Sequence, residues 1–267
     1  MTPVSKNDIK NTLHSVGLSK GDTVIFHSSL KSFGQVEGGA DAVIDAFLEV
    51  VSDEGTVIVP TLIAKNFSDA YQTWYMDKPS DVGYITEVFR KRPEAMRSNQ
   101  PTHPVAAIGK NAEFLTETHG ESGKRFGIYG DTPFSKDSPW QKMYDVNAKV
   151  VLVGVDFDKM TFRHLFEYTL VDEALQNAEK RGEYDEAIKS ICSFEGRPNR
   201  SDTYFWPYLS NKLSEFAEPF VKSEMCGAAL IKCISIKTFG DALLENVRNN
   251  FDQWYEGNIL KWFNVYK

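Results

Sequence analysis

Ala148-Lys-Val-Val-Leu-Val-Gly154 is the stretch of this sequence that decides the fold class. It is a continuous, β-branched apolar run that ends at a glycine, which is typical of a strand buried on both faces of a sheet. The chain from Thr161 to Arg181 then carries a helical pattern. A buried strand that leads into a helix predicts an α/β fold.

The same alternation of strands and helices extends toward the N-terminus. Short apolar runs predict further strands over 23–27, 55–60 and 105–109. Amphipathic patterns predict helices over 5–16, 40–51 and 83–90, and a long polar loop follows over 119–139. The last third mixes a helix over 213–220, a strand over 228–236 and an aromatic tail. We therefore expect one domain, with a three-layer, largely parallel α/β core over 1–175 and an α+β elaboration over 176–267.

Composition excludes several classes of protein. The 267 residues are 42% hydrophobic and 25% charged, which fits a globular chain and not a disordered or fibrous one. A net charge of -7 argues against a nucleic-acid-binding protein, which would need a basic stripe. No apolar run approaches the roughly 18 residues of a membrane span, and the first residues carry no apolar signal segment. We expect a soluble cytoplasmic protein without a membrane partner, and the oligomeric state stays open.

Several common chemical signatures are absent. The sequence contains no G-x-G-x-x-G, no G-x-x-x-x-G-K-[ST], no G-x-S-x-G and no H-E-x-x-H. The three cysteines form no C-x-x-C pair and the five histidines are scattered, so we expect no metal site and no disulfide framework.

Three segments carry polar groups where chemistry is expected. The first is His27-Ser-Ser-Leu-Lys-Ser-Phe-Gly34, which follows a predicted strand and precedes a predicted helix. That position offers hydroxyls, a lysine and free backbone N–H groups to a phosphate or to a pantetheine chain. The alternative is a plain strand-to-helix turn. The candidate ligand-binding residues of this segment and its continuation are Ser28, Ser29, Lys31, Ser32, Gly34 and Val36.

The second segment is Arg97-Ser-Asn-Gln-Pro-Thr-His-Pro104, which leads into the predicted strand over 105–109. A guanidinium can bind a phosphate through two hydrogen bonds. Hydrogen bonds within the loop are the alternative role for these residues. The candidates for ligand binding are Arg97, Ser98, Thr102 and His103.

The third segment, Thr161-Phe-Arg-His-Leu-Phe-Glu167, begins a predicted helix. His164 and Glu167 are three residues apart, so they share one face of its first turn. A carboxylate beside an imidazole orients the ring and stabilises its protonated form, as a general base requires. An ion pair on the helix surface is the alternative reading.

Together these segments resemble the aminoglycoside 3-N-acetyltransferase family, whose fold differs from that of the common acetyltransferases. The pattern H-S-S-L-x-x-x-G-x-V-x-G-G is matched at every fixed position by 27–39, and G-T-x-x-x-P-T by 55–61. The element R-S-x-H-P-T-H-S-x-A-A-x-G is matched in part by 97–109, and Ser138-Pro139 and T-x-x-H-x-x-E complete the order. The likeness covers about residues 5–175.

Two departures from the pattern fall in the central element. Gln100 stands where the family has its first histidine, and Pro104 stands where it has a serine. Proline has no N–H and restricts the residue before it, here His103, to an extended conformation. The C-terminal third matches only loosely, and in this family it helps to shape the acceptor pocket.

The resemblance implies acetyl-CoA as donor, no metal, and a primary amine of an aminoglycoside or amino sugar as acceptor. Transfer would be direct, with His164 as general base and Glu167 as its support. Donors to the thioester oxygen would come from the turn at Ser28 and Ser29 or from Ser98 or Thr102. The residues implied for acetyl-CoA are the ligand-binding candidates of the first two segments, with Lys31, Ser32 and Arg97 on its phosphates or pantetheine arm.

Two other functions stay open at this point. The acceptor could be a nucleotide-linked amino sugar for a surface polysaccharide, because the divergent tail supplies groups that suit a pyrophosphate and a base. These groups are Arg197, Arg200, Tyr204, Trp206 and Lys212. The third reading is a CoA-binding protein without catalysis, which the change at Gln100 keeps open.

Overall fold

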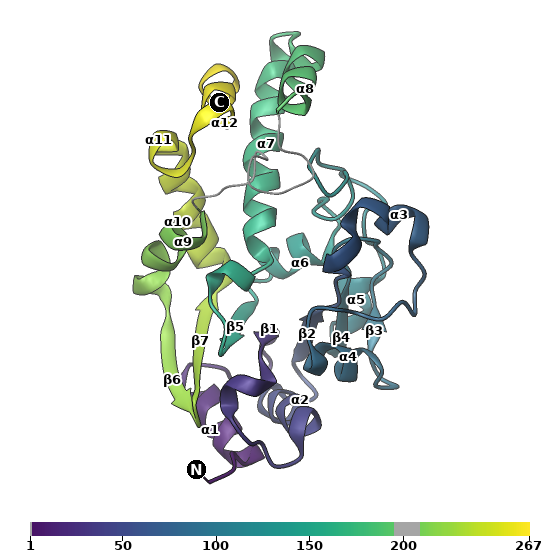
Figure 1. The fold of residues 1–267 in the computed structure, drawn as a ribbon, viewed down its shortest axis with the longest axis vertical. Coiled ribbons are helices and arrows are strands. Elements are labelled where there is room, and N and C mark those ends of the chain that lie inside the picture. The colour runs from purple at the N-terminus through teal and green to yellow at the C-terminus, as the bar shows by residue number, and fades with distance from the viewer. Residues whose placement is uncertain (1, 195–208) are drawn as a thin grey trace.

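The computed structural model describes residues 2–194 and 209–267. Its framework is a seven-stranded sheet with the order β3-β4-β2-β1-β5-β7-β6 (Figure 1). The strands are β1 Thr23–Ser28, β2 Thr56–Pro60, β3 Met96–Arg97, β4 Val105–Gly109, β5 Lys149–Val153, β6 Lys222–Cys226 and β7 Ala229–Ser235. The expected α/β fold is confirmed, and β3 and β6 are edge strands that the sequence pattern did not predict.

The sheet is parallel at its centre and antiparallel on both sides. β1 pairs in parallel with β2 and with β5, and its residue Ile25 lies opposite Ile58 and Val150. β4 is antiparallel to β2 and β3, and β7 is antiparallel to β5 and β6. The largely parallel arrangement that we expected therefore holds for the three central strands, and the whole sheet is mixed.

Helices cover both faces of the sheet, which gives the expected three layers (Figure 1). One layer holds α1 Lys6–Ser15, α2 Gly39–Val51 and α4 Tyr84–Arg90. The other holds α5 Ala112–Thr116, α6 Pro139–Asp145, α7 Phe162–Lys180, α8 Tyr184–Cys192, α9 Leu209–Ala217, α10 Ile236–Asn249, α11 Phe251–Trp254 and α12 Gly257–Tyr266. Short elements complete the chain: η1 Leu30–Phe33, η2 Ala64–Asp69, α3 Ala70–Thr73, η3 Phe157–Lys159 and η4 Glu218–Phe220.

Strand residues alternate between the two cores because successive side chains of a strand point to opposite faces. In β1, Val24 and Phe26 belong to the α2 side, and Ile25 belongs to the α7 side. The same alternation directs His27, at the end of this strand, to the α7 side. His27 therefore faces the layer that contains the long helix α7.

The C-terminal helices α10 and α12 pack beside α7 (Figure 1). Helix α12 packs against both α7 and α8, and the Trp262 indole N–H donates to the Ala187 carbonyl at 3.0 Å. A layer of buried aromatic side chains, including Tyr255 and Phe263, fills this region. The aromatic tail predicted from sequence is therefore part of the α7-side core.

Neither a membrane-crossing helix nor a metal-holding cluster occurs among the described residues. Across 2–194 and 209–267, no helix is long and apolar enough to cross a membrane. Within the same ranges, no group of three or more His, Cys, Asp or Glu side chains is arranged to hold a metal ion. Cys226 and Cys233 are buried thiols, and Cys192 is exposed.

Candidate active site

A pocket of about 380 Å³ lies at the carboxyl ends of the three parallel strands. Its lining includes His27 and Ser28 at the end of β1, Pro60 at the end of β2 and Val155 just after β5. Ligands of α/β sheets bind at this edge because the strand-to-helix loops gather there. The topology therefore brings together loops that are more than a hundred residues apart in sequence.

The antiparallel strand β4 brings a further loop to the same edge. Its first residue, Val105, pairs with the last residue of β2, Pro60. The segment before β4 consequently lies beside the end of β2, and the Pro104 carbonyl accepts a hydrogen bond from the Thr61 N–H at 2.8 Å. Of the residues predicted in this segment, His103 lines the pocket.

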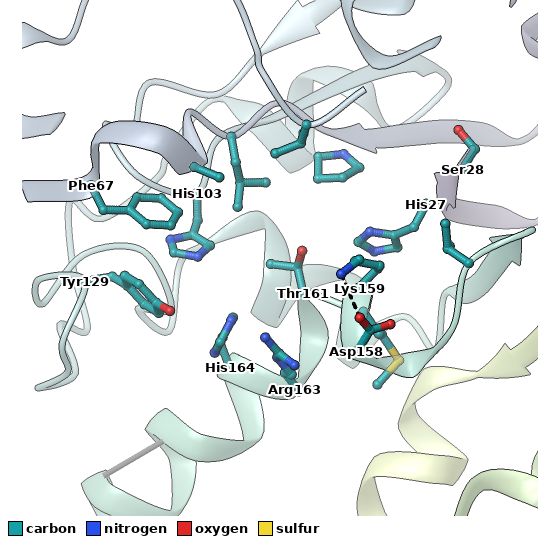
Figure 2. Close-up of a pocket in the computed structure, with 16 residues that line it drawn as sticks. His27, Ser28, Phe67, His103, Tyr129, Asp158, Lys159, Thr161, Arg163 and His164 are labelled. Carbon is teal, nitrogen blue, oxygen red and sulfur yellow. Dashed lines mark hydrogen bonds and ion pairs between the residues drawn. The ribbon is translucent and has the colours of Figure 1, made fainter. Parts of the chain in front are cut away.

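The first turn of α7 supplies the pair that the sequence singled out. His164 lines the pocket, and its Nδ1 lies 2.6 Å from Oε2 of Glu167 (Figure 2). Only 8% of His164 and 2% of Glu167 are exposed. An ion pair on the helix surface is thus excluded as the explanation of this spacing, because both groups are inside the protein.

Burial controls the proton affinity of this pair. Loss of solvation raises the pKa of the Glu167 carboxyl well above its usual value, and the Arg163 guanidinium opposes that shift. A buried carboxylate beside a neutral imidazole carries one net negative charge, and uptake of a proton converts it to a neutral ion pair. The two groups therefore take up and release one proton as a unit.

Aromatic rings surround the His164 imidazole. The ring centroids of Tyr129, His103 and Phe134 lie 5.1, 5.6 and 5.9 Å from that of His164. Phe67 stacks on His103 with 5.3 Å between centroids (Figure 2). These contacts fix the plane of the imidazole and keep bulk water away from the pair.

Two tyrosine hydroxyl groups hold the backbone of the loop that carries Tyr129. The Tyr71 hydroxyl donates to the Tyr129 carbonyl, and the Tyr168 hydroxyl donates to the Gly130 carbonyl and accepts from the Tyr129 N–H, all at 2.9–3.0 Å. Gly130 has φ +98°, and a Cβ there would come within 2.1 Å of the Tyr71 hydroxyl. Only glycine combines this conformation with this close approach. The predicted loop over 119–139 is thus a fixed wall of the pocket.

The pocket also contains groups that our sequence analysis did not select. His27 is 7% exposed and stands at the end of β1, and burial together with the nearby Arg163 lowers its pKa to about 4. Lys159, which pairs with Asp158 at 2.7 Å, and Arg163 also line the pocket. The signal for His27 was present, because it is the first residue of the H-S-S-L match.

The turn after β1 lies partly in the pocket and partly beside it. Ser28 lines the pocket, whereas the Ser32 hydroxyl donates to the Ser29 carbonyl at 2.6 Å. Ser32 packs against Gly154 after β5, where a Cβ would come within 1.8 Å of the Ser32 hydroxyl oxygen. Lys31 and Gly34 are exposed beyond the lining residues, and Val36 forms an isolated bridge with Val4.

Arg97 makes its hydrogen bonds inside the protein. Its guanidinium donates to the Thr61 carbonyl and hydroxyl, and to the carbonyls of Met76 and Lys78, at 2.6–3.1 Å. It also lies 4.7 Å from the ring centroid of Trp74. The side chain ties the 61–78 segment to β3 and is not among the residues that line the pocket.

The hydroxyl groups of Ser98 and Thr102 also make hydrogen bonds within the protein. The fully buried Ser98 hydroxyl accepts from the Val105 N–H at 3.0 Å and lies 2.9 Å from Nδ1 of His119. Thr102 is 1% exposed, and its hydroxyl lies 3.0 Å from Nδ1 of His103. Both lie behind the pocket wall, and a direct contact of either with acetyl-CoA stays a prediction.

Gln100, where the sequence departs from the family pattern, makes side-chain hydrogen bonds within the protein. Its side-chain carbonyl accepts hydrogen bonds from the N–H groups of Thr102 and His103 at 2.7 and 2.5 Å. Its amide donates to the hydroxyls of Tyr71 and Thr132 at 3.3 and 3.2 Å. The glutamine therefore joins three loops around the pocket and holds the backbone of His103.

Comparison with known proteins identifies the family to which this chain belongs. The profile of the aminoglycoside 3-N-acetyltransferase family matches residues 25–241, from β1 to α10. The chain belongs to this family. Its homologues are named aminoglycoside N(3)-acetyltransferases, which are acyltransferases. The resemblance predicted from the motifs is thus confirmed.

Individual relatives extend over most of the chain. The aminoglycoside N(3')-acetyltransferase-like protein YokD of Bacillus subtilis is 34% identical over 196 residues, which are 66% of this chain and 69% of YokD. An aminoglycoside N(3)-acetyltransferase III of Acinetobacter baumannii is 28% identical over 90% of this chain and 91% of its own length. The crystal structure of YokD matches with a TM-score of 0.69 at 25% identity, covering 96% of this chain and 97% of YokD. The fold is shared with AAC-IIIb, solved as a binary complex with CoASH, at a TM-score of 0.69 and 18% identity over 92% of this chain and 97% of that one.

Proposed function

We propose that this protein transfers the acetyl group of acetyl-CoA to an amine of an aminoglycoside, with His164 as general base. The observation that carries the proposal is the buried pair of His164 and Glu167 on the wall of the pocket. Family membership supports the reaction class and the acceptor class. We place the reaction in the cytoplasm, where acetyl-CoA is available.

The chemistry requires a base because an alkyl ammonium group cannot attack a thioester. Nε2 of His164 takes a proton from the acceptor nitrogen, while Nδ1–H donates to Glu167. The nitrogen attacks the thioester carbon, a C–N bond forms, and the carbonyl electron pair moves to oxygen. When the tetrahedral intermediate collapses, the C–S bond breaks and its electrons leave with the CoA sulfur. The bonded nitrogen releases its second proton to the medium, and the proton held by His164 neutralises the thiolate.

The donor would reach the pocket along the turn after β1. Ser28 is the member of this turn that lines the pocket, and its neighbour Ser29 is held by a hydrogen bond from its N–H to the Val153 carbonyl at 3.0 Å. Lys159 and Arg163 offer positive charge to the same pocket. Contacts of Lys31 and Ser32 with the CoA phosphates remain proposals that rest on the resemblance. The proposed contacts of Gly34, Val36 and Arg97 with acetyl-CoA also rest on the resemblance, because none of the three lines the pocket.

The two alternative functions receive no support from the described residues. Four of the five groups that suited a nucleotide-linked sugar, Arg197, Arg200, Tyr204 and Trp206, lie outside those residues, and the Lys212 ammonium donates to the Gln253 carbonyl. A catalytically inactive CoA-binding protein would have no need to keep a formed, buried histidine–carboxylate pair. Acetylation of an aminoglycoside amine therefore fits the observations best.

The test is release of thiol from acetyl-CoA in the presence of a panel of amines. The panel contains several aminoglycosides, simple amino sugars and a nucleotide-linked amino sugar, and mass spectrometry locates the new acetyl group. We expect turnover with aminoglycosides and acetylation at the 3-amino position. Turnover with the nucleotide-linked sugar alone would replace the proposed acceptor, and no turnover with any amine would refute the proposal.

A further inference from the structure

His27 occupies a position in the pocket that the general-base mechanism leaves without a role. It is the last buried residue of the central strand β1, and it lines the same pocket as His164 (Figure 2). Its Nε2 is buried and has no hydrogen-bond partner within 2–194 and 209–267. A buried polar atom without a partner is destabilising, and an apolar residue such as its neighbour Ile25 would avoid that loss.

The contrast with the other buried histidines sharpens this point. Both ring nitrogens of His119 have partners, the Ser98 hydroxyl and the Pro133 carbonyl, each at 2.9 Å. His103 has the Thr102 hydroxyl, and His164 has Glu167. Of these four rings, His27 is the one with a buried ring nitrogen that has no hydrogen-bond partner among the described residues. A buried histidine with a purely structural role would have hydrogen-bond partners for its ring nitrogens, as His119 has.

The protonation state of His27 limits its chemistry. Burial is the main cause, and Arg163 a second cause, of a pKa near 4. At neutral pH the ring is therefore uncharged, with one N–H that can be donated. A neutral imidazole does not give up its proton easily, but it can donate a hydrogen bond to a developing negative charge. The ring is thus unsuited to act as a base or acid and well suited to act as a donor.

We propose that the imidazole N–H of His27 donates a hydrogen bond to the acetyl oxygen of the donor as the tetrahedral intermediate forms. The proposal rests on the proposed function, and it assigns to His27 the role of stabilising the oxyanion. As the amine attacks, the carbonyl electron pair moves to this oxygen, and the hydrogen bond strengthens without transfer of the proton. The bond weakens again when the C–S bond breaks and the amide carbonyl forms. His164 handles the proton throughout.

The test compares three variants with the wild-type enzyme: His27→Leu, His27→Gln and, as a matched control, His14→Gln on the surface helix α1. Loss of one oxyanion donor lowers kcat by about 100- to 1000-fold, so we expect this fall in His27→Leu with little change in the KM for acetyl-CoA. His27→Gln restores part of kcat because its amide offers an N–H. His14→Gln keeps the wild-type rate.

Two readouts are independent of turnover. The thioester carbonyl stretch of bound acetyl-CoA, measured by infrared difference spectroscopy, should lie at lower frequency in the wild type and in His14→Gln than in His27→Leu. The free energy of unfolding at pH 7 should be no lower in His27→Leu than in the wild type. If no amine is acetylated, the proposed function fails while the carbonyl stretch still tests the hydrogen bond.

Three results would overturn the inference. An unshifted carbonyl stretch in His27→Leu would show that the ring does not contact the acetyl oxygen. A raised KM with unchanged kcat would assign His27 to ground-state binding, and a large loss of stability would assign it to the core.

Discussion

Two polar segments meet at the carboxyl edge of the sheet, and they differ in where their hydrogen bonds go. In the loop over 97–103, Arg97, Ser98 and Gln100 direct their donors and acceptors into the protein. In the first turn of α7, His164 is held on one edge by Glu167, and its ring lines the pocket. Both segments match the pattern of the same family, but only the second places a histidine–carboxylate pair on the pocket wall.

A polar motif in the sequence can therefore serve either the fold or a ligand. A side chain is available to a substrate where the folded chain leaves part of its hydrogen-bonding capacity unfilled. The guanidinium of Arg97 already donates four hydrogen bonds to protein oxygens. The comparison therefore predicts that substitutions in the loop act mainly on stability, and those in α7 mainly on rate.

The largest effect is expected at His164. Replacement by alanine removes the base, so kcat should fall by about 100- to 10,000-fold, while acetyl-CoA binding stays nearly unchanged. Steady-state kinetics and calorimetry with acetyl-CoA measure the two quantities, and urea unfolding checks that the variant is folded. A folded His164→Ala enzyme with near-normal turnover would show that the ring only packs against the helix.

The next effect is the loss of stability in Arg97→Ala. Four hydrogen bonds and a contact with Trp74 disappear, and carbonyls of the 61–78 segment lose their partner, so the free energy of unfolding should fall by about 3 kcal/mol. Urea unfolding at pH 7 measures it. Arg97→Lys is the matched control, and it should recover only part of the loss because an ammonium cannot reach all four oxygens. Normal stability with a raised KM for acetyl-CoA would instead place Arg97 on the donor phosphates.

A smaller effect concerns the pH dependence of stability through His119, the partner of Ser98. Burial lowers the pKa of His119 to about 4, whereas the unfolded chain titrates near 6.5. As the pH falls from 6.5 toward 4, the unfolded state binds the proton first, so the free energy of unfolding falls. At pH 5 the titration of this histidine lowers the free energy of unfolding by about 2 kcal/mol. Urea unfolding at pH 7 and 5 should therefore show a smaller difference in His119→Gln than in the wild type, and an equal difference would contradict the prediction.

The smallest effect is expected for Glu167→Gln. Without the carboxylate, the protonated ring becomes an unpaired buried charge, so the apparent pKa of the activity profile should move downward. Turnover should fall by about 10- to 100-fold, less than on loss of the ring. The pH dependence of kcat measures both changes. An unchanged apparent pKa would show that Glu167 does not influence the proton affinity of the base.

Much of the framework could be predicted from the sequence. The apolar runs predicted β1, β2, β4, β5 and β7, and the helix predicted over 5–16 is α1, which begins with a capping box between Ser5 and Asp8. The strands β3 and β6 were missed because each is a short edge strand without an apolar run. The pattern also could not show that the flanking strands run antiparallel, since apolar periodicity carries no information on strand direction.

For the site, sequence spacing determined that His164 and Glu167 share a face of one helix, because a helix fixes the relative position of residues three apart. It also determined family membership, through motifs whose order and spacing are local properties of the chain. Only the tertiary structure decided that this pair is buried, that the antiparallel β4 brings His103 to the end of β2, and that Arg97 is turned inward. Burial and the supply of hydrogen-bond partners come from segments distant in sequence, and for that reason the unfilled capacity of His27 became visible only in the folded chain.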